Sequence, residues 1–352
     1  MSFIKKFAII DLIIFRLEKG CTMLKLGIVG TGWISGSFVE AAYLTKKYSL
    51  EAVYSRNLES AVSFTEDFDD VELYDSLDDF FKHDLDIIYI ASPNAIHFEQ
   101  AKAAILAGKN VIVEKPAFSN PQELAEIITL ADKHKVLFFE AARNIHEKAF
   151  ETINLFLADK KIVGADFTYS KYSSKMPALL SGKIPNKFNS KFSGGLLADL
   201  GVYLLYAAVY WFDKPQSACY DAVILPSGVD LSGVGSLNYG DFKVAIKCAG
   251  NLNSYLTSEI YTDEGTLILD GVNAITSAKF IRFDGSKEVI KITPPKHSLY
   301  DEALHFAEII ETISTPAAYS LYKDLHHLAQ DVSETSYMMR QSAGIVFEAD
   351  KK

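Results

Sequence analysis

The chain has 352 residues, of which 49% are hydrophobic and 23% charged, and its formal net charge at pH 7 is -10. This length fits two domains better than a single core, and the apolar fraction excludes wholesale disorder. The negative charge argues against nucleic acid as a partner, because phosphate-backbone binding needs a basic surface. Three cysteines without a CxxC pair predict a reduced, cytoplasmic setting.

Residues 1–22 precede the first strand pattern and are treated separately. They contain an apolar run at 7–15 behind Lys5 and Lys6. The run is too short to span a membrane, and no small-residue cleavage site follows it. We expect a leader outside the fold, which begins at Met23, and no membrane segment. A secretion signal is the alternative interpretation.

From residue 23 to residue 142 short apolar runs alternate with helical stretches. Strands are predicted at 24–29, 50–54, 87–91, 111–113 and 136–139. Helices between them include 95–107 and 121–134. Short runs that are apolar on both faces and separated by helices indicate a parallel sheet covered on both sides. We therefore expect a doubly wound, dinucleotide-binding Rossmann domain over residues 23–142.

The turn after the first predicted strand is rich in glycine. Gly30 and Gly32 follow the strand directly and open a helix, and Ser35 stands where a third glycine is usual. Small residues there let backbone amides approach a pyrophosphate at the positive end of the helix. The alternative is a tight turn of a methyltransferase or of a fold without a ligand. We predict a dinucleotide site that includes Gly30, Thr31, Gly32, Trp33 and Ile34.

The end of the second predicted strand bears on the choice of cofactor. NAD enzymes place an acidic residue there for the ribose 2′-hydroxyl, whereas this chain has Ser55 and Arg56. A hydroxyl and a guanidinium suit a 2′-phosphate. We predict NADP, with NAD possible if Arg56 is only a solvated loop charge.

Lys115 follows another strand, at the edge of the sheet where ligands of doubly wound folds bind. Oxidation of an alcohol needs a side chain that takes the hydroxyl proton while the nicotinamide takes hydride. A lysine at this edge can bond the reacting oxygen and stabilise a developing alkoxide. The alternative role is a surface ion pair with Glu114.

After residue 142 the pattern changes, and we expect an α+β domain over residues 143–352. Helices are predicted at 147–159, 197–212, 300–313 and 322–341. A strand at 165–172 and several half-exposed strands within 222–292 indicate a largely antiparallel sheet. Such a sheet favours a homodimer or a higher homo-oligomer, and the last helix can pack back on the Rossmann domain.

Asp199 and Tyr203 share one face of the apolar helix at 197–212, because they are four residues apart. A carboxylate in such a helix needs a partner, for which Lys115 or a substrate would serve. Tyr203 is then a candidate proton carrier. Tyr206 and Tyr210 lie on the same helix, so an aromatic core stripe is the alternative for the tyrosine.

Three motifs together resemble the Gfo/Idh/MocA oxidoreductase family: the glycine turn, the stretch from Ser92 to His97 with Glu114-Lys115-Pro116, and the segment 194–203. The resemblance covers the chain from Met23 almost to its end. It implies a second domain that carries the substrate and oligomer surfaces, and a candidate cis bond before Pro116. It also implies cofactor contacts from Ser92, Pro93, Asn94, His97, Glu114 and Lys115.

Many members of the family carry histidine where this chain has Tyr203. The tyrosine resembles the branch with glucose-fructose oxidoreductase, dihydrodiol dehydrogenase and NADP-linked aldose dehydrogenases, in agreement with Ser55 and Arg56. We therefore predict an NAD(P)-dependent oxidoreductase that moves hydride between the nicotinamide and a hydroxyl or carbonyl of a sugar, polyol or diol. Lys115, Asp199 and Tyr203 are its predicted catalytic residues.

Two other functions stay open at this point. One is a glycosidase-like enzyme of the same family, in which bound NAD is oxidised and reduced again in each cycle. The other is a non-catalytic protein that senses a nucleotide or a sugar. We predict no metal site, because the pair His326-His327 lacks a third ligand at metal spacing.

Overall fold

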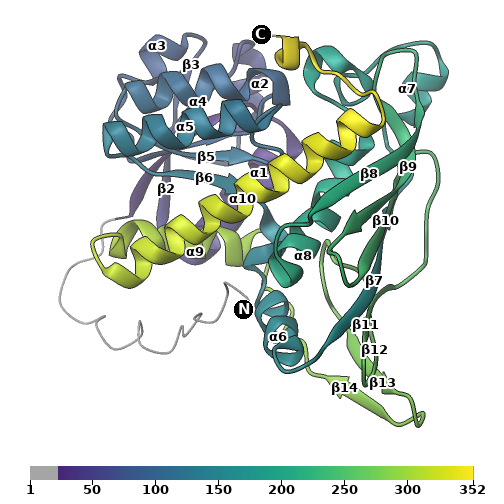
Figure 1. Cartoon of the computed structure of the whole chain (residues 1–352). Coiled ribbons are helices and arrows are strands. Elements are labelled where there is room, and N and C mark those ends of the chain that lie inside the picture. Colours follow the sequence, from purple (N-terminus) through teal and green to yellow (C-terminus); the bar gives the residue numbers. More distant parts are fainter. Residues whose placement is uncertain (1–22, 352) are drawn as a thin grey trace.

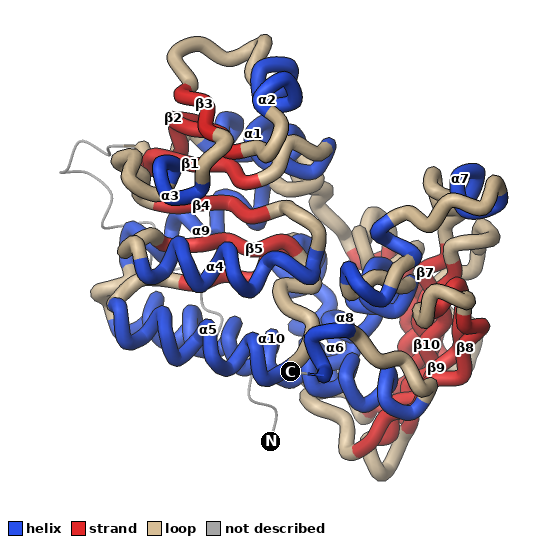
Figure 2. Tube along the Cα trace, turned by 90° about the horizontal axis from the view of Figure 1, so that it is seen from above, coloured by secondary structure: helices blue, strands red, loops and turns tan. Residues whose placement is uncertain are grey.

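The computed structural model describes residues 23–351 (Figure 1). The predicted leader, residues 1–22, lies outside the described residues. Two sheets organise the described chain, one with six strands and one with eight. Figure 2 shows them side by side, with the helices of the first unit lying along both of its faces.

The first sheet is parallel throughout and has the order β3-β2-β1-β4-β5-β6. The strand order reverses between β1 and β4, which opens a ligand crevice at the carboxyl ends of these strands. The sequence did not indicate β3, a three-residue edge strand whose pairing with β2 depends on tertiary structure. The strands are β1 (Leu24–Val29), β2 (Tyr48–Tyr54), β3 (Glu72–Tyr74), β4 (Ile87–Ile90), β5 (Asn110–Glu114) and β6 (Phe138–Ala141).

Helices cover both faces of this sheet. On one face α4 (His97–Leu106) and α5 (Pro121–His134) pack over a core that includes Ile88 and Val113. On the other face α1 (Trp33–Thr45) packs beside α9 (Tyr300–Thr312), which returns from the far end of the chain. Two short helices, α2 (Leu58–Phe64) and α3 (Leu77–Phe80), flank the β2 and β3 edge.

The second sheet has the order β14-β13-β12-β11-β7-β10-β9-β8, and β7 with β10 is its one parallel pair among the described residues. The largely antiparallel sheet expected from the sequence is therefore confirmed. Its strands are β7 (Ile162–Ser170), β8 (Ser217–Ile224), β9 (Asp230–Asn238), β10 (Lys243–Ala249), β11 (Ser258–Thr262), β12 (Gly265–Leu269), β13 (Ala278–Arg282) and β14 (Lys287–Ile290).

A buried helix lies across one face of the second sheet. A π-helical turn, Leu197–Gly201, leads into α8 (Val202–Phe212). Phe212 stacks against Phe167 of β7, and Trp211 meets the same ring edge to face. Within the described residues, Ser190–Phe212 is long and apolar enough to cross a membrane, but 83% of its most apolar window is buried in the protein. Burial of this kind is expected of the core helix that the structure shows.

Shorter helices connect these elements. The α-helices are α6 (Lys148–Leu157) and α7 (Met176–Leu180). The 3-10 turns are η2 (Asn94–Ile96), η3 (Arg143–His146), η4 (Asn186–Phe188), η5 (Ser190–Phe192) and η7 (Glu348–Lys351). The turns η4 and η5 belong to a long connection between β7 and α8, where the sequence predicted a loop.

The long helix α10 (Pro316–Ser342) runs from the first unit to the second (Figure 1). At its start the Tyr322 hydroxyl accepts a hydrogen bond of 3.1 Å from the Phe138 amide, and His326 Nε2 lies 3.0 Å from the Phe138 carbonyl oxygen. Further along, Val332 and Met339 belong to the core of the second unit. The helix therefore fixes both units against each other.

Candidate active site

The glycine turn has the geometry that a dinucleotide needs. Gly30 has φ +99°, and a Cβ there would lie 2.9 Å from the Ala91 carbonyl oxygen, so a side chain is excluded. A Cβ on Gly32, in contrast, would meet nothing within 4 Å. The first turn of α1 has no side-chain cap and no acidic residue. Its backbone amides therefore face open space at the positive end of the helix, which fits a pyrophosphate.

The other residues predicted for this turn differ in exposure. Trp33 is 83% exposed at the start of α1, whereas Thr31 and Ile34 are half-buried. Ser35 is fully buried, as expected if it replaces glycine for close packing of the helix. Trp33, Thr31 and Ile34 are thus placed where they can contact a ligand.

Ser55 and Arg56 follow β2, directly beside the glycine turn. The Gly30 amide donates a hydrogen bond of 3.1 Å to the carbonyl oxygen of Tyr54, the last residue of β2. Ser55 is half-buried and Arg56 is exposed. Within residues 23–351 the Arg56 guanidinium forms no ion pair and no side-chain hydrogen bond. The Arg56 guanidinium can therefore bind a phosphate on the ribose of a dinucleotide.

The loop from Ser92 to His97 is held mainly by its own contacts. The Ser92 hydroxyl donates to Gln100 Oε1 at 2.5 Å, and Pro93 precedes η2. His97 is 1% exposed, and its two ring nitrogens lie 2.7 Å from the Ser92 oxygen and 3.1 Å from the Ala117 oxygen. Burial lowers the pKa of His97, and a neutral imidazole can donate only one of these two bonds. His97 therefore fixes the loop through its contacts with the carbonyl oxygens of Ser92 and Ala117.

Asn94 extends this loop toward the second unit. Its Nδ2 donates a hydrogen bond of 3.1 Å to the carbonyl oxygen of Ser193, just before the π-helical turn. The Ser193 hydroxyl in turn lies 2.6 Å from that of Ser119. The predicted cofactor loop is thus joined to the segment that carries Asp199.

Lys115, Asp199 and Tyr203 lie together, as the sequence predicted. Lys115 Nζ donates to the Asp199 carbonyl oxygen at 2.8 Å and lies 3.5 Å from its Oδ1. The same ammonium is 4.6 Å from the centroid of the Tyr203 ring. The side chain of Lys115 is 12% exposed and that of Asp199 is 34% exposed. The peptide bond between Lys115 and Pro116 is cis, as anticipated.

Charges inside this cluster shift the pKa values of its members. Burial alone would lower the pKa of Lys115, but Tyr203, Asp199 and Glu114 outweigh it, so the pKa lies above its ordinary value. Burial alone would raise the pKa of Asp199, but Lys115 and Lys187 outweigh it, so that pKa is lowered. At neutral pH the site therefore contains an ammonium beside a carboxylate.

Lys187 is a member of this cluster that the sequence did not single out. It lies on η4, and its ammonium forms an ion pair with Oδ2 of Asp199. Its side chain is 28% exposed. The stretch from residue 167 to residue 198 contains five lysines and no acidic residue, which is the signal that could have indicated it.

Arg143 and Tyr169 complete the surroundings of Tyr203. The Arg143 guanidinium lies 5.5 Å from the Tyr203 ring centroid and forms a 3.2 Å ion pair with Glu147. The Tyr169 ring of β7 meets Tyr203 edge to face at 5.8 Å. Burial raises the pKa of Glu147 to about 7, although Arg143 opposes the shift. Tyr203 is therefore a half-buried residue between two cations, whereas Tyr206 and Tyr210 belong to the core.

Glu114 is held by hydrogen bonds at the end of β5. Its carboxylate accepts hydrogen bonds from the Tyr89 hydroxyl and, at 3.2 Å, from the Lys115 amide. Burial raises its pKa, and the neighbouring Lys115 opposes this shift. Glu114 thus holds the strand end that carries Lys115.

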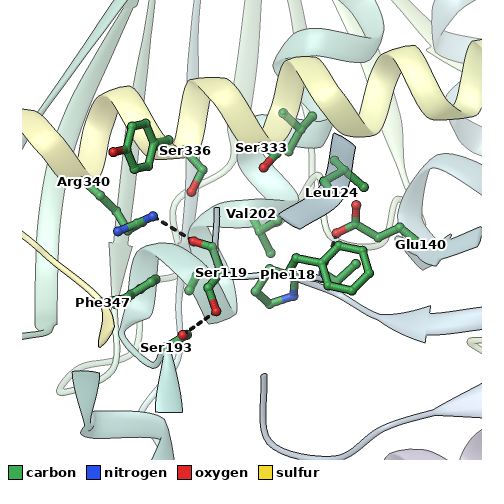
Figure 3. Close-up of a pocket in the computed structure, with 15 residues that line it drawn as sticks. Phe118, Ser119, Leu124, Glu140, Ser193, Val202, Ser333, Ser336, Arg340 and Phe347 are labelled. Atoms are coloured by element: carbon green, nitrogen blue, oxygen red, sulfur yellow. Dashed lines mark hydrogen bonds between the residues drawn. The ribbon is translucent and has the colours of Figure 1, made fainter. Parts of the chain in front are cut away.

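A small cavity lies behind Lys115, between the segment 116–119, the π-helical turn and α10 (Figure 3). Ala198 and Val202 line it, whereas their neighbours Asp199 and Tyr203 do not. Glu140 also lines it, with its Oε1 accepting a 2.9 Å bond from the Ala117 amide. Arg340 Nη2 donates to the Ser119 carbonyl oxygen at 2.8 Å. The first bond fastens the segment after Lys115 to β6, and the second fastens it to the end of α10.

Comparison with known proteins identifies the family. Residues 24–142 match the GFO_IDH_MocA model, described as an oxidoreductase family with an NAD-binding Rossmann fold. An uncharacterized oxidoreductase of Escherichia coli (strain K12), YgjR, is 34% identical over 333 residues, which cover 93% of this chain and 99% of the relative. The chain belongs to the Gfo/Idh/MocA oxidoreductase family.

Other proteins that this chain resembles have more specific names. The scyllo-inositol 2-dehydrogenase (NADP(+)) IolU of Bacillus subtilis (strain 168) is 32% identical over 332 residues, 94% of this chain and 100% of the relative. A levoglucosan dehydrogenase solved with NADH and levoglucosan has a TM-score of 0.77 at 17% identity, over 92% of this chain and 98% of that one. At that identity the second likeness shows the fold alone.

The family assignment confirms the predicted family, fold class and class of enzyme. It also confirms a nicotinamide dinucleotide as the cofactor. The chain is thus an NAD(P)-dependent oxidoreductase, and its glycine turn, open at Gly32, fits that cofactor. The roles of individual site residues stay predictions.

Proposed function

We propose that this oxidoreductase is an NADP-linked dehydrogenase of sugars, polyols or diols, with Lys115, Asp199 and Tyr203 as its catalytic residues. The observation that carries the proposal is their convergence at the carboxyl end of β5, on the same sheet edge as the open glycine turn. Lysine, carboxylate and phenol together can bind a hydroxyl and take up its proton. When bound, the nicotinamide supplies the hydride acceptor or donor.

The charges of Lys115 and Asp199 support a separate role for each of the three side chains. Lys115 keeps its proton at neutral pH, because its pKa lies above the ordinary value, so it acts as a donor and as a positive charge. It stabilises negative charge that develops on the substrate oxygen. Tyr203, between Lys115 and Arg143, takes the proton from the hydroxyl. Asp199 orients Lys115 and accepts a hydrogen bond from a neighbouring hydroxyl of the substrate.

NADP is the cofactor that the residues after β2 favour. Arg56 is exposed beside the glycine turn without a partner in the described chain, and the position lacks a carboxylate that would repel a phosphate. The name of the Bacillus subtilis relative, an NADP(+)-linked scyllo-inositol dehydrogenase, supports both the cofactor and a polyol substrate. Relatives named trans-1,2-dihydrobenzene-1,2-diol dehydrogenase support the diol class.

The test is turnover of free cofactor by the purified protein. We expect NADP⁺ to be reduced in the presence of inositols, aldoses or vicinal diols, as followed by nicotinamide absorbance. Sustained turnover of free cofactor would also exclude the glycosidase-like cycle, in which the cofactor stays bound. Binding of NADPH without turnover of any of these substrates would contradict the proposal. A cytoplasmic location and a homodimer or higher homo-oligomer stay predictions from the sequence.

A further inference from the structure

The connection between β7 and the π-helical turn has an unusual charge for this chain. Residues 167–198 contain Lys171, Lys175, Lys183, Lys187 and Lys191 and no acidic residue, in a protein of net charge -10. Lys171, Lys175, Lys183 and Lys191 are exposed. Within the described chain these four form no ion pair shorter than 4.0 Å. The segment is therefore a local concentration of positive charge.

Lys187 brings this charge into the candidate active site. Its ammonium pairs with Asp199 Oδ2, while Lys115 Nζ lies 3.5 Å from Oδ1 of the same carboxylate. One carboxylate thus faces two ammonium groups. Lys187 therefore shares its carboxylate partner with a second ammonium group.

Lys171 adds to this charge from the second sheet. Its amide donates to the Ala249 carbonyl oxygen at 3.0 Å, which continues the β7–β10 ladder one residue beyond Ser170. Side chains alternate along a strand, so Lys171 shares a face with Tyr169. Tyr169 is the residue that meets the Tyr203 ring edge to face. Lys171 therefore lies on the strand face that carries Tyr169, whereas Lys187 reaches Asp199 from η4.

We propose that the substrate carries an anionic group, a carboxylate or a phosphate, which Lys187 binds with Lys171 beside it. This inference rests on the proposed dehydrogenase function and narrows its substrate class to acidic sugars or polyols. The side chain of Lys187 is 28% exposed, so it can leave Asp199 for another anionic partner. The freed Asp199 carboxylate then accepts a hydrogen bond from the substrate hydroxyl while Lys115 keeps its own position.

The experiment compares matched substrates with NADP⁺ as the oxidant. Each neutral aldose is assayed beside its uronate and its monophosphate, and each inositol beside its monophosphate, so that the two anionic arms separate carboxylate from phosphate. We expect kcat/KM for one acidic arm to exceed that of the neutral sugar by at least about tenfold, since a charge-assisted hydrogen bond contributes this much or more. The advantage should shrink at high salt, because the lysines are partly exposed.

Variants of Lys187 test whether this side chain recognises the anionic group or affects the site as a whole. Lys187→Gln should reduce the acidic-to-neutral ratio of kcat/KM by roughly 10- to 100-fold, and Lys187→Arg should restore most of it. Lys183→Gln, in the same segment but with no contact to Asp199, is the matched control and should keep the wild-type ratio.

Three outcomes would overturn the inference. Equal kcat/KM for neutral and acidic members of each pair contradicts the anionic substrate while leaving the dehydrogenase function intact. An unchanged ratio in Lys187→Gln removes Lys187 from recognition. Turnover of no substrate at all, although NADPH binds, contradicts the proposed function and this inference with it.

Discussion

At the scale of the residue, removal of the Tyr203 hydroxyl distinguishes a catalytic role of this side chain from a packing role. Tyr203→Phe keeps the ring that meets Tyr169 and that lies 4.6 Å from Lys115 Nζ, but removes the group that takes the proton. We expect kcat to fall by about 10²- to 10⁴-fold, with the free energy of unfolding changed by less than about 1 kcal/mol. Steady-state kinetics and denaturant titration measure the two effects.

The control for this variant is Tyr210→Phe. Tyr210 lies on the same helix but packs in the core, where its ring centroid is 5.5 Å from that of Phe150. Its hydroxyl therefore has no access to substrate. We expect wild-type kcat for Tyr210→Phe. An equal loss of kcat in both variants would mean that Tyr203 packs in the core like Tyr210 and has no catalytic role.

Lys115→Met tests the electrostatic role of the ammonium. Methionine keeps much of the aliphatic stem, and Asp199 retains its ion pair with Lys187, so the fold should tolerate the change. Loss of the charge beside the developing alkoxide should lower kcat by about 10²- to 10³-fold. The control is Lys102→Met on α4. Lys102 forms an exposed ion pair with Glu126 of α5, and this variant should retain activity. Wild-type kcat in Lys115→Met would remove the ammonium of Lys115 from catalysis.

Helix periodicity predicted that Asp199 and Tyr203 share a face, and the family resemblance placed Lys115 in the same site, with Lys115 or a substrate as the partner of the carboxylate. The sequence could not place Lys187, whose approach to Asp199 depends on the path of a loop that has two 3-10 turns. It also did not indicate that His97 has both ring nitrogens against backbone carbonyls. That arrangement follows from tertiary packing of the cofactor loop on the segment after Lys115.

At the scale of the element, the turn that carries Asp199 depends on a buried carboxylate of β9. Asp230 is 1% exposed and accepts hydrogen bonds from the amides of Leu196 at 3.0 Å and Leu197 at 2.7 Å, and from the Tyr220 hydroxyl at 2.8 Å. Asp230→Asn places an amide nitrogen among these donors. We expect the free energy of unfolding to fall by about 1–3 kcal/mol, measured by urea denaturation.

An exposed aspartate on the adjacent strand provides the comparison for this variant. Asp221 lies on β8 and is exposed. Asp221→Asn should change stability by no more than about 0.5 kcal/mol. A loss as large as that of Asp230→Asn would mean that a general charge effect, and not the three buried bonds, sets the stability.

The contact of α10 with β6 should make stability depend on pH. Burial lowers the pKa of His326 to about 4, below the ordinary value of roughly 6.5 that applies to the unfolded chain. Between these values the unfolded state binds a proton that the folded state does not, so stability falls as the pH falls. From pH 6.5 to pH 5 the loss from this residue is roughly 2 kcal/mol.

His326→Gln keeps a donor for the Phe138 carbonyl oxygen and removes the titration. We expect its unfolding free energy to decline less than that of the wild type over this range, in denaturation curves taken at several pH values. His327→Gln, at the adjacent exposed position, should follow the wild type. Identical pH dependence in His326→Gln and the wild type would contradict the assignment.

The sequence located most accurately those elements that have strong local patterns. The predicted strand at 24–29 and helix at 121–134 have the bounds of β1 and α5, because an apolar run and an Asn120 cap with Pro121 mark them. The beginning of β8 was predicted five residues too late, since its exposed face alternates weakly. Short α7 lacked enough residues for a helical period.

At the scale of the whole molecule, both units contribute to one site. Lys115 and the glycine turn come from the first unit, and Asp199, Tyr203 and Lys187 from the second. The bonds Asn94–Ser193, Ser119–Ser193 and Arg340–Ser119 cross between the units around that site. The fold class followed from the order of elements along the chain, but which side chains face each other across the units depends on these tertiary contacts.

The central claim is that this molecule is an NADP-linked enzyme, and a fluorescence titration with NADPH and NADH tests it most directly. We expect NADPH to bind tightly to the wild type and more weakly by at least about tenfold to Arg56→Ala, because a charge-assisted contact to the 2′-phosphate is lost. The affinity for NADH should change little. Equal affinities for both cofactors in the wild type, unaltered in Arg56→Ala, would contradict the account.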